Sequence, residues 1–271
     1  TAVKNAEKDE KQVFEMYYEY EEPVNRIVPH RILAINRGEK EDVLRASITV
    51  PVERAVQMME NKWIPKNFTS GAVTHIKEAI ADSYKRLIEP SIEREIRAEL
   101  TEKAEAQAIH IFSENLRNLL LQPPIRGKMV LGVDPAYRTG CKLAVVDETG
   151  KMLEVTAIYP HPPKPDVAKS KAVVKALLKK YPISIIAIGN GTASRETEQF
   201  IVDTLKEIEN DIAYVIVNEA GASVYSASDV ARAEFPDLQV EQRSAVSIAR
   251  RLQDPLSELV KIDPKAVGVG Q

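Results

Sequence analysis

The spacing of apolar residues divides the chain into two regimes, of which the first is helical. After Ser70, apolar residues recur every three or four positions as far as Leu87, and after Ser91 the same spacing continues for about 30 residues. Because serine is a favoured N-cap, the pattern predicts two helices that begin at these serines. Three shorter elements are also expected: helices over 5–20 and over 29–37, the latter ended by Gly38, and a strand over 43–50.

The apolar pattern changes after residues 122–127, where two prolines and a glycine interrupt it. Short, almost wholly apolar runs now alternate with helical stripes, which is typical of strands in a buried sheet. Strands are predicted over 129–134, 141–146, 152–159, 183–188 and 214–217, and helices from Asp166, from Thr192, near 223–234 and over 244–258. Three strands joined by hairpins and then α/β crossovers predict a mixed sheet with helices on both faces.

The fold class expected is therefore α + α/β, with a helical region followed by a ribonuclease-H-like sheet domain. The helical region is assigned to residues 1–125 and the sheet domain to residues 126–258. The Pro-Pro pair at Pro123 breaks regular structure and marks the boundary between them.

Composition narrows the class of protein. The chain has 271 residues, 44% hydrophobic and 28% charged, with no apolar run long enough to span a membrane. Its one cysteine, Cys141, cannot form an internal disulfide, which favours a cytoplasmic location. The net charge of −3 means that any contact with phosphates must come from local basic patches.

Polar residues at the ends of three predicted strands are the candidate chemistry. Asp134, Asn190 and Glu219 each follow an apolar run and are expected at the carboxyl edge of the sheet, where α/β proteins bind ligands. In two-metal nucleases carboxylates at this position hold Mg²⁺, but Asn190 is a neutral, weaker ligand. Asp134 before proline also suits a turn, and Glu219 also suits a helix start, so the pattern leaves both interpretations open.

Arginines surround these candidates. Arg138 follows the first strand, Arg195 lies in the first turn after Asn190, and the last helix is expected to begin without an acid. That helix region instead carries a basic set, Arg243, Arg250 and Arg251. Such residues suit contact with nucleic-acid phosphates, although a solvated helix face is an equally simple interpretation.

Longer motifs resemble one known family. GVDPAYRTG, AIGNGTASRETE, NEAGASVYSAS and SIARRLQDPLSELVKIDPKAVGVGQ look like the Tex family of bacterial transcription accessory proteins, and EPVNRIVPHRILAINRGEKE resembles its helical part. The resemblance implies a helix-turn-helix-containing region first and then a YqgF-type domain related to ribonuclease H and the RuvC resolvase. Residues 259–271 would begin a helix-hairpin-helix module, and a C-terminal S1-type RNA-binding domain usually follows in the family.

The same resemblance matches Asp134 and Glu219 to two of about four carboxylates in YqgF-type nucleases. An undercharged site favours a domain that binds nucleic acid without cutting it, so we expect a scaffold rather than an enzyme. No cofactor is expected, and Mg²⁺ is the ion that any residual site at Asp134, Glu219 and Asn190 would take. The expected partners are RNA or DNA and components of the transcription or translation machinery, with no membrane.

Three alternatives stay open at this point. A metal-dependent RuvC-like nuclease acting on structured nucleic acid is the first. An actin-like or sugar-kinase ATPase shares the strand order, but it needs paired glycine-rich phosphate loops and this sequence has one. The third is a protein that docks onto other proteins through its long helices.

Overall fold

The computed structural model describes residues 1–67, 70–209 and 211–268, and it divides into two compact units, Thr1–Ile111 and Phe112–Gln271. The division falls inside a long helix, whereas the sequence predicted a boundary near residue 125. The reason is local packing: the last turns of this helix place Leu116, Leu119 and Leu120 against a buried cluster of the second unit. In the part of the chain that the structure describes, no helix is long and apolar enough to cross a membrane.

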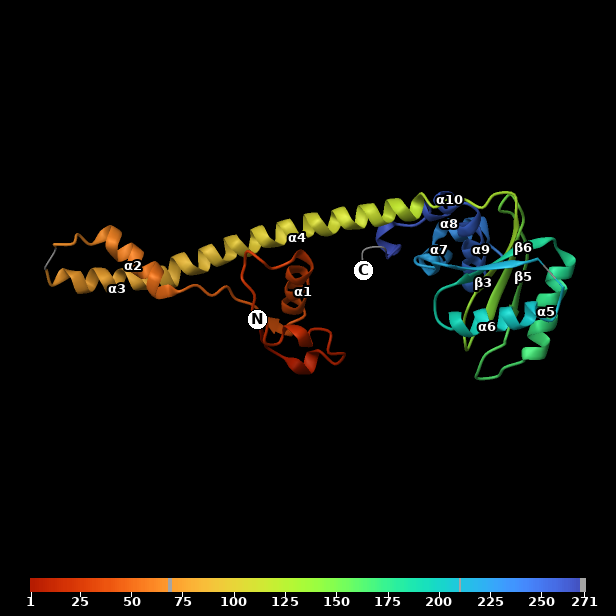
Figure 1. Cartoon of the computed structure of the whole chain (residues 1–271), viewed down its shortest axis with the longest axis horizontal. Helices are drawn as coiled ribbons and strands as arrows, with labels where there is room; N and C mark the ends of the chain where they lie inside the picture. The colour runs from red at the N-terminus through yellow and green to blue at the C-terminus, as the bar shows by residue number, and fades with distance from the viewer. Residues whose placement is uncertain (68–69, 210, 269–271) are drawn as a thin grey trace. The chain divides into compact units, whose positions relative to one another are not determined.

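The first unit is mainly helical (Figure 1). A short strand, β1 (Ala2–Val3), pairs antiparallel with β2 (Leu44–Arg45). Its α-helices are α1 (Pro29–Lys40), α2 (Val52–Trp63), α3 (Ala72–Ser83) and α4 (Glu89–Leu120). All but α2 correspond to predicted helices. A π-helical turn (Tyr84–Ile88) joins α3 to α4 without a break, so Ser91 lies inside the helix and caps nothing.

The helix predicted over 5–20 is wrong, and the side chain of Asp9 explains why. Two short 3-10 helices, Ala6–Lys8 and Glu15–Tyr17, replace it. The Asp9 carboxylate accepts hydrogen bonds from the backbone N–H groups of Val13 and Phe14, both at 2.8 Å. A short acidic side chain that takes over backbone donors in this way competes with helix formation.

Two further differences in the first unit come from packing. Gly38 does not end α1 but lies within it. Packing against β2 explains the glycine, because a Cβ here would come within 2.5 Å of Leu44 Cδ1. The strand predicted over 43–50 is only Leu44–Arg45, since its partner β1 is two residues long and the described part of the chain offers no further pairing. The amphipathic helix α2 was not predicted at all.

The second unit contains the expected five-stranded mixed sheet in the order β5-β4-β3-β6-β7. Its strands are β3 (Met129–Asp134), β4 (Cys141–Val146), β5 (Met152–Ile158), β6 (Ile183–Gly189) and β7 (Ala213–Val217). The first three are antiparallel neighbours, and β6 and β7 run parallel to β3. This is the topology that the sequence predicted.

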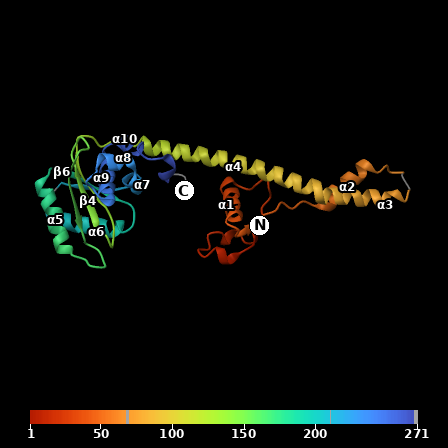
Figure 2. The same cartoon turned by 180° about the vertical axis from the view of Figure 1, so that it is seen from behind.

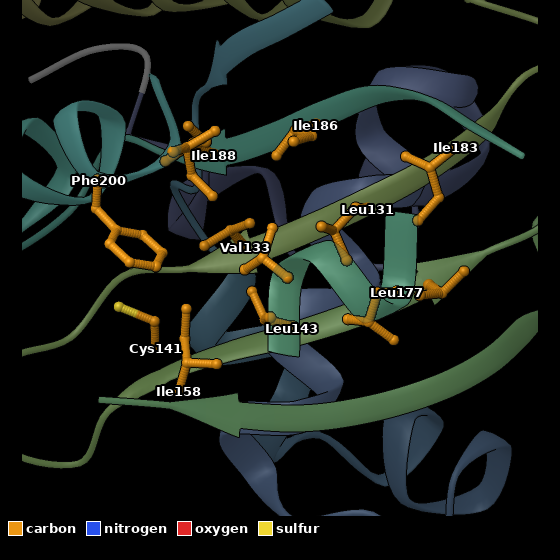
Figure 3. Packing of buried hydrophobic residues seen from close by; sticks show 13 residues of the cluster. Leu131, Val133, Cys141, Leu143, Ile158, Leu177, Ile183, Ile186, Ile188 and Phe200 are labelled. Atoms are coloured by element: carbon orange, nitrogen blue, oxygen red, sulfur yellow. The ribbon is translucent and has the colours of Figure 1, made fainter. Parts of the chain in front are cut away.

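Helices cover both faces of this sheet. Figure 1 shows α5 (Val167–Lys180) and α9 (Val240–Gln253) on opposite sides of the strands, and Figure 2 shows the same arrangement from behind. On one face, α5 and α6 (Ser194–Leu205) bury Val174, Leu177, Phe200 and Ile201 against aliphatic strand residues. Figure 3 shows Leu177 and Phe200 beside strand residues of this cluster. On the other face, the small residues of α9 pack against β3.

Close approach of α9 to the sheet depends on Gly132 in β3. A Cβ at this position would overlap the backbone oxygen of Ala245 and lie 2.9 Å from the Cβ of Ala249. Glycine and alanines therefore let α9 lie close to the strand, and this fixes which residues of α9 reach the end of β3.

Helix boundaries in the second unit differ from the predicted ones in three places. Residues 223–234 form two helices, α7 (Ala222–Ala227) and α8 (Asp229–Glu234), since Ser228 accepts the capping hydrogen bond of the second. The helix predicted over 244–258 is α9 followed by α10 (Pro255–Leu259). The first residue of α6 follows Ala193 in a left-handed conformation, so Thr192 is not its cap. Of the module expected over 259–271, residues 269–271 lie outside the described residues, and the assignment stays a prediction.

Candidate nucleic-acid site at the sheet edge

The three polar strand ends meet as the sequence predicted. β3, β6 and β7 are parallel neighbours, with Val133 in register with Ile188 and Gly189 in register with Val217. Asp134, Asn190 and Glu219 therefore share the carboxyl edge of the sheet.

Asp134 is a half-buried carboxylate whose surroundings oppose its charge. Burial raises its pKa to about 6, and the negative charges of Glu219 and Glu241 add to the effect. A hydrogen bond with the Ser244 hydroxyl and the positive charge of Lys142 act in the opposite direction. At neutral pH the group is ionised, but only at a cost in free energy relative to water.

Lys142 is the basic residue that pairs with Asp134 across the β3–β4 ladder. It lies directly opposite Asp134 in the antiparallel β3–β4 ladder, and residues at such positions project from the same face. Its side chain is buried, and the ammonium donates to the backbone oxygens of Thr139 and, at 2.9 Å, Gly140. A fixed positive charge thus occupies the neighbourhood in which a nuclease would place metal ions.

Glu219 reaches back over the loop that follows β6. The two glycines of this loop make room for it, because a Cβ on Gly191 would come within 2.6 Å of the carboxyl carbon of Glu219 and a Cβ on Gly189 would overlap Oε2. Burial raises the pKa of Glu219, while a hydrogen bond from the Gly191 N–H and the charge of Arg251 partly offset that rise. Its Oε2 atom is buried without a hydrogen-bond partner.

Asn190 connects the segments that follow β6 and β7. The side-chain oxygen of Asn190 accepts a hydrogen bond from the backbone N–H of Glu219 at 3.1 Å, and the backbone N–H of Asn190 donates to Val217 O at 3.0 Å. The ends of β6 and β7 are locked together by this pair of bonds. The side-chain oxygen of Asn190 thus has a structural role at this edge.

The residues present do not fit a two-metal centre. Within 1–67, 70–209 and 211–268, no three histidine, cysteine, aspartate or glutamate side chains are grouped as metal ligands. Two divalent ions need several carboxylate oxygens, whereas here Asn190 and Ser244 are neutral and Lys142 is positive. A single ion held by Asp134 and Glu219 stays a prediction.

The expectation that the last helix begins without an acid is wrong. Because α9 begins at Val240, four residues earlier than predicted, Glu241 lies in its first turn. A mutual capping arrangement of Gln239 and Gln242 sets this early start. Glu241 is exposed and acts on Asp134 through its charge.

Three of the five arginines expected to bind phosphate are engaged within the fold. The buried Arg243 donates to Phe235 O and Ser226 O, and the buried Arg251 donates to Asn218 O and Ala220 O. Burial lowers the pKa of Arg251 to about 10. These guanidinium groups hold loops in place by bonding carbonyl oxygens.

Arg250 is also occupied by contacts within the domain. It donates to Gly150 O at 2.7 Å, pairs with Glu234 and lies over the ring of Phe235. By contrast, Arg138, in the turn after β3, and Arg195, in the first turn of α6, are exposed. They are the two candidate cations that remain accessible at this edge of the sheet.

Sequence reasoning missed Lys142, Ser244 and Glu241. Lys142 is the one charged residue within an otherwise apolar strand, and the short connection from β3 would have placed it opposite Asp134. Ser244 and Glu241 could not be predicted, because their positions depend on where α9 starts and on how closely it approaches β3. The local sequence pattern gives neither.

Comparison with known proteins bears directly on this architecture. The model of the Tex protein YqgF-like domain matches residues 128–253, and the model of the Tex central region-like domain matches residues 1–112. These two ranges correspond closely to the sheet domain and to the helical unit.

Full proteins from distant organisms are similar over nearly all of the chain. It is 65% identical over 270 residues to the uncharacterized protein YdcI of Bacillus subtilis and 41% identical over 276 residues to the transcriptional accessory protein Tex of Neisseria gonorrhoeae, each match covering 100% of this chain. It is 43% identical over 265 residues, 95% of the chain, to the human S1 RNA-binding domain-containing protein 1. The chain spans 37%, 36% and 26% of the lengths of these relatives. The chain thus belongs to the Tex family, of which it carries the central region and the YqgF-like, ribonuclease-H-like domain.

Proposed function

We propose that this chain is part of a cytoplasmic, nucleic-acid-binding transcription accessory protein whose ribonuclease-H-like domain binds without cleaving. The names of two relatives, a transcriptional accessory protein and an S1 RNA-binding domain-containing protein, support the general role. RNA and DNA are both candidate ligands, and the transcription or translation machinery is the proposed setting.

One observation carries the non-catalytic assignment. Beside Asp134 and Glu219, the strand end between them holds the neutral Asn190, the Ser244 hydroxyl contacts Asp134, and Lys142 contributes a buried cation. Phosphodiester hydrolysis of this type depends on two metal ions that stabilise the attacking and leaving oxygens. A site with this charge balance binds such ions poorly.

A cleavage assay tests this assignment. The chain is incubated with labelled duplex, single-stranded and branched substrates in Mg²⁺ and in Mn²⁺, beside an Asp134→Ala variant prepared identically. We expect no cleavage above the level of the variant, because the site binds two metal ions poorly. The variant is the control for a contaminating nuclease, which would act equally in both preparations. Cleavage by the native chain that disappears in the variant would refute the proposal.

Nucleic-acid binding at the carboxyl edge of the sheet is assigned to the exposed arginines Arg138 and Arg195. Each phosphate contact contributes about 0.7 to 0.9 to the slope of log K against log salt, so Arg138→Gln with Arg195→Gln should lower the slope by about 1 to 2. Fluorescence anisotropy with labelled RNA and DNA over a salt series measures it. Lys179→Gln is the control, because Lys179 is exposed near the end of α5, which leads to the opposite edge of the sheet. An unchanged slope in the double variant would rule out this edge as the binding surface.

A metal-dependent nuclease is the second candidate, and a specific observation favours it. Glu241 brings a third negative charge to the neighbourhood of Asp134, whose raised pKa also suits proton transfer near neutral pH. If the cleavage assay is positive, Glu241→Gln should reduce the rate as Asp134→Ala does, and the domain is then an enzyme.

A further inference from the structure

The outer strand β7 (Ala213–Val217) is an open edge of the sheet. It is the last strand in the order β5-β4-β3-β6-β7, and among the described residues it pairs only with β6. The ladder with β6 is regular over all five residues, with no bulge. Such an edge offers a straight row of backbone groups to another strand.

The direction of the free backbone groups follows from the ladder. Val217 O points toward β6, since it accepts from Asn190 N at 3.0 Å. Backbone groups of successive residues in a strand point alternately to its two sides. Tyr214 and Ile216 therefore direct their N–H and C=O groups away from β6, toward the open side.

The side chains of β7 are apolar and only partly covered on both faces. Tyr214, Val215 and Ile216 are 39%, 37% and 41% exposed. Val215 shares a face with Val217, which packs in the cluster with α9, while Tyr214 and Ile216 face the opposite way. An added strand would continue the apolar surface on both sides.

The other edge of the same sheet is protected, and the contrast is informative. β5 carries Glu154, which pairs with Lys180 at 2.6 Å and accepts from the Tyr181 hydroxyl at 2.8 Å. Its register with β4 is also irregular between Val145 and Val146. Charges and bulges are the devices by which proteins block edge-to-edge pairing, and β7 has neither.

We propose that β7 docks an extended segment of a partner protein, with an apolar centre and flanking lysines or arginines, as an added strand. The basic flanks follow from the charges beside the strand: Glu209 and Asp211 are exposed and have no ion-pair partner among the described residues. A second copy of this chain fits less well. Antiparallel pairing centred on Val215 would set Asp211 against Glu219, and parallel pairing would set Asp211 beside Asp211.

Peptide binding tests this proposal. A fluorescent peptide with a core of alternating valine and threonine and two lysines at each end is titrated up to millimolar concentration with the whole chain, followed by anisotropy. The same core with glutamates at the ends is the comparison. We expect saturable binding of the lysine peptide and at least about tenfold weaker binding of the glutamate peptide.

Variants assign the binding to the edge. Ile216→Pro removes an outward N–H while keeping the bonds to β6, and Val215→Lys places a blocking charge on the strand. Each should weaken binding about tenfold. Leu153→Lys is the matched control, because Leu153 on the β5 edge has the same 37% exposure, and it should leave binding unchanged. Amide hydrogen exchange in β3 confirms that each variant is folded.

Several outcomes would overturn the proposal. They are absence of peptide binding by the native chain, equal binding of the two peptides, and a loss of binding in Leu153→Lys as large as in the β7 variants. Self-association that Val215→Lys abolishes would identify a second copy of the chain as the occupant instead.

Discussion

Replacing Asp134 with asparagine should stabilise the sheet domain, and the gain should depend on pH. Burial raises the pKa of Asp134 to about 6 from the ordinary 3.8. The folded state therefore keeps its proton where the unfolded chain has lost it, so stability falls as pH rises from about 4 to 6. Below this window the carboxyl is neutral in both states and costs nothing.

The magnitude follows from the size of the shift. At about 1.4 kcal/mol per pKa unit, the ionised carboxylate costs roughly 3 kcal/mol at pH 7.5 and roughly 1 kcal/mol at pH 4.5. Asparagine removes this cost and can still accept the hydrogen bond from Ser244. The variant should therefore gain about 2 kcal/mol more at pH 7.5 than at pH 4.5, equivalent to about 30-fold in the unfolding equilibrium.

Hydrogen exchange of β3 amides is the appropriate assay, because the only tryptophan, Trp63, lies in the other unit and would not report on the sheet. Protection of peptides covering Val130–Val133, corrected for intrinsic rates, gives the free energy of opening at each pH. Ser247→Ala is a useful comparison, since it changes a buried polar group of α9 without removing a charge. An identical gain at both pH values, or a loss at pH 7.5, would refute the electrostatic explanation.

Two other predictions concern packing and charge at the same edge. Gly132→Ala should destabilise the sheet domain by about 3 kcal/mol or more, because its Cβ would overlap the backbone oxygen of Ala245. Gly71→Ala is the control and should have little effect, because a Cβ there meets nothing within 4 Å. Hydrogen exchange and thermal unfolding measure both variants. Lys142→Met should raise the pKa of Asp134 above about 6, because a positive charge that favours ionisation is removed. A ¹³C titration of the carboxyl group follows this, and an unchanged midpoint would show that the ammonium does not act on Asp134.

The strands were predictable because their signal is local. All five begin and end within one residue of the predicted positions. Buried strands require continuous apolar runs, and turn residues bound them clearly. The weaker predictions lie where one side chain overrules the pattern, as Asp9 does by capturing the backbone N–H groups of Val13 and Phe14.

The arginines show a different limit of sequence reasoning. Arg243 and Arg250 are seven residues apart on α9, yet the first is buried against carbonyl oxygens and the second bonds Gly150 and Glu234. A charged residue on a helix is usually solvated, so the pattern predicted an accessible basic face. The direction of a long side chain depends on the residues that pack opposite it. The spacing of residues along one helix does not reveal these partners.

The sequence by itself determined that Asp134, Asn190 and Glu219 meet at one edge, because parallel strands must bring their carboxyl ends together. Only the tertiary structure decided the character of that edge. The position of Lys142 and the contact of Ser244 with Asp134 arise from strand register and from the close approach of α9. Charge balance in a half-buried site depends on distances between residues remote in the chain, and these exist only once the chain has folded.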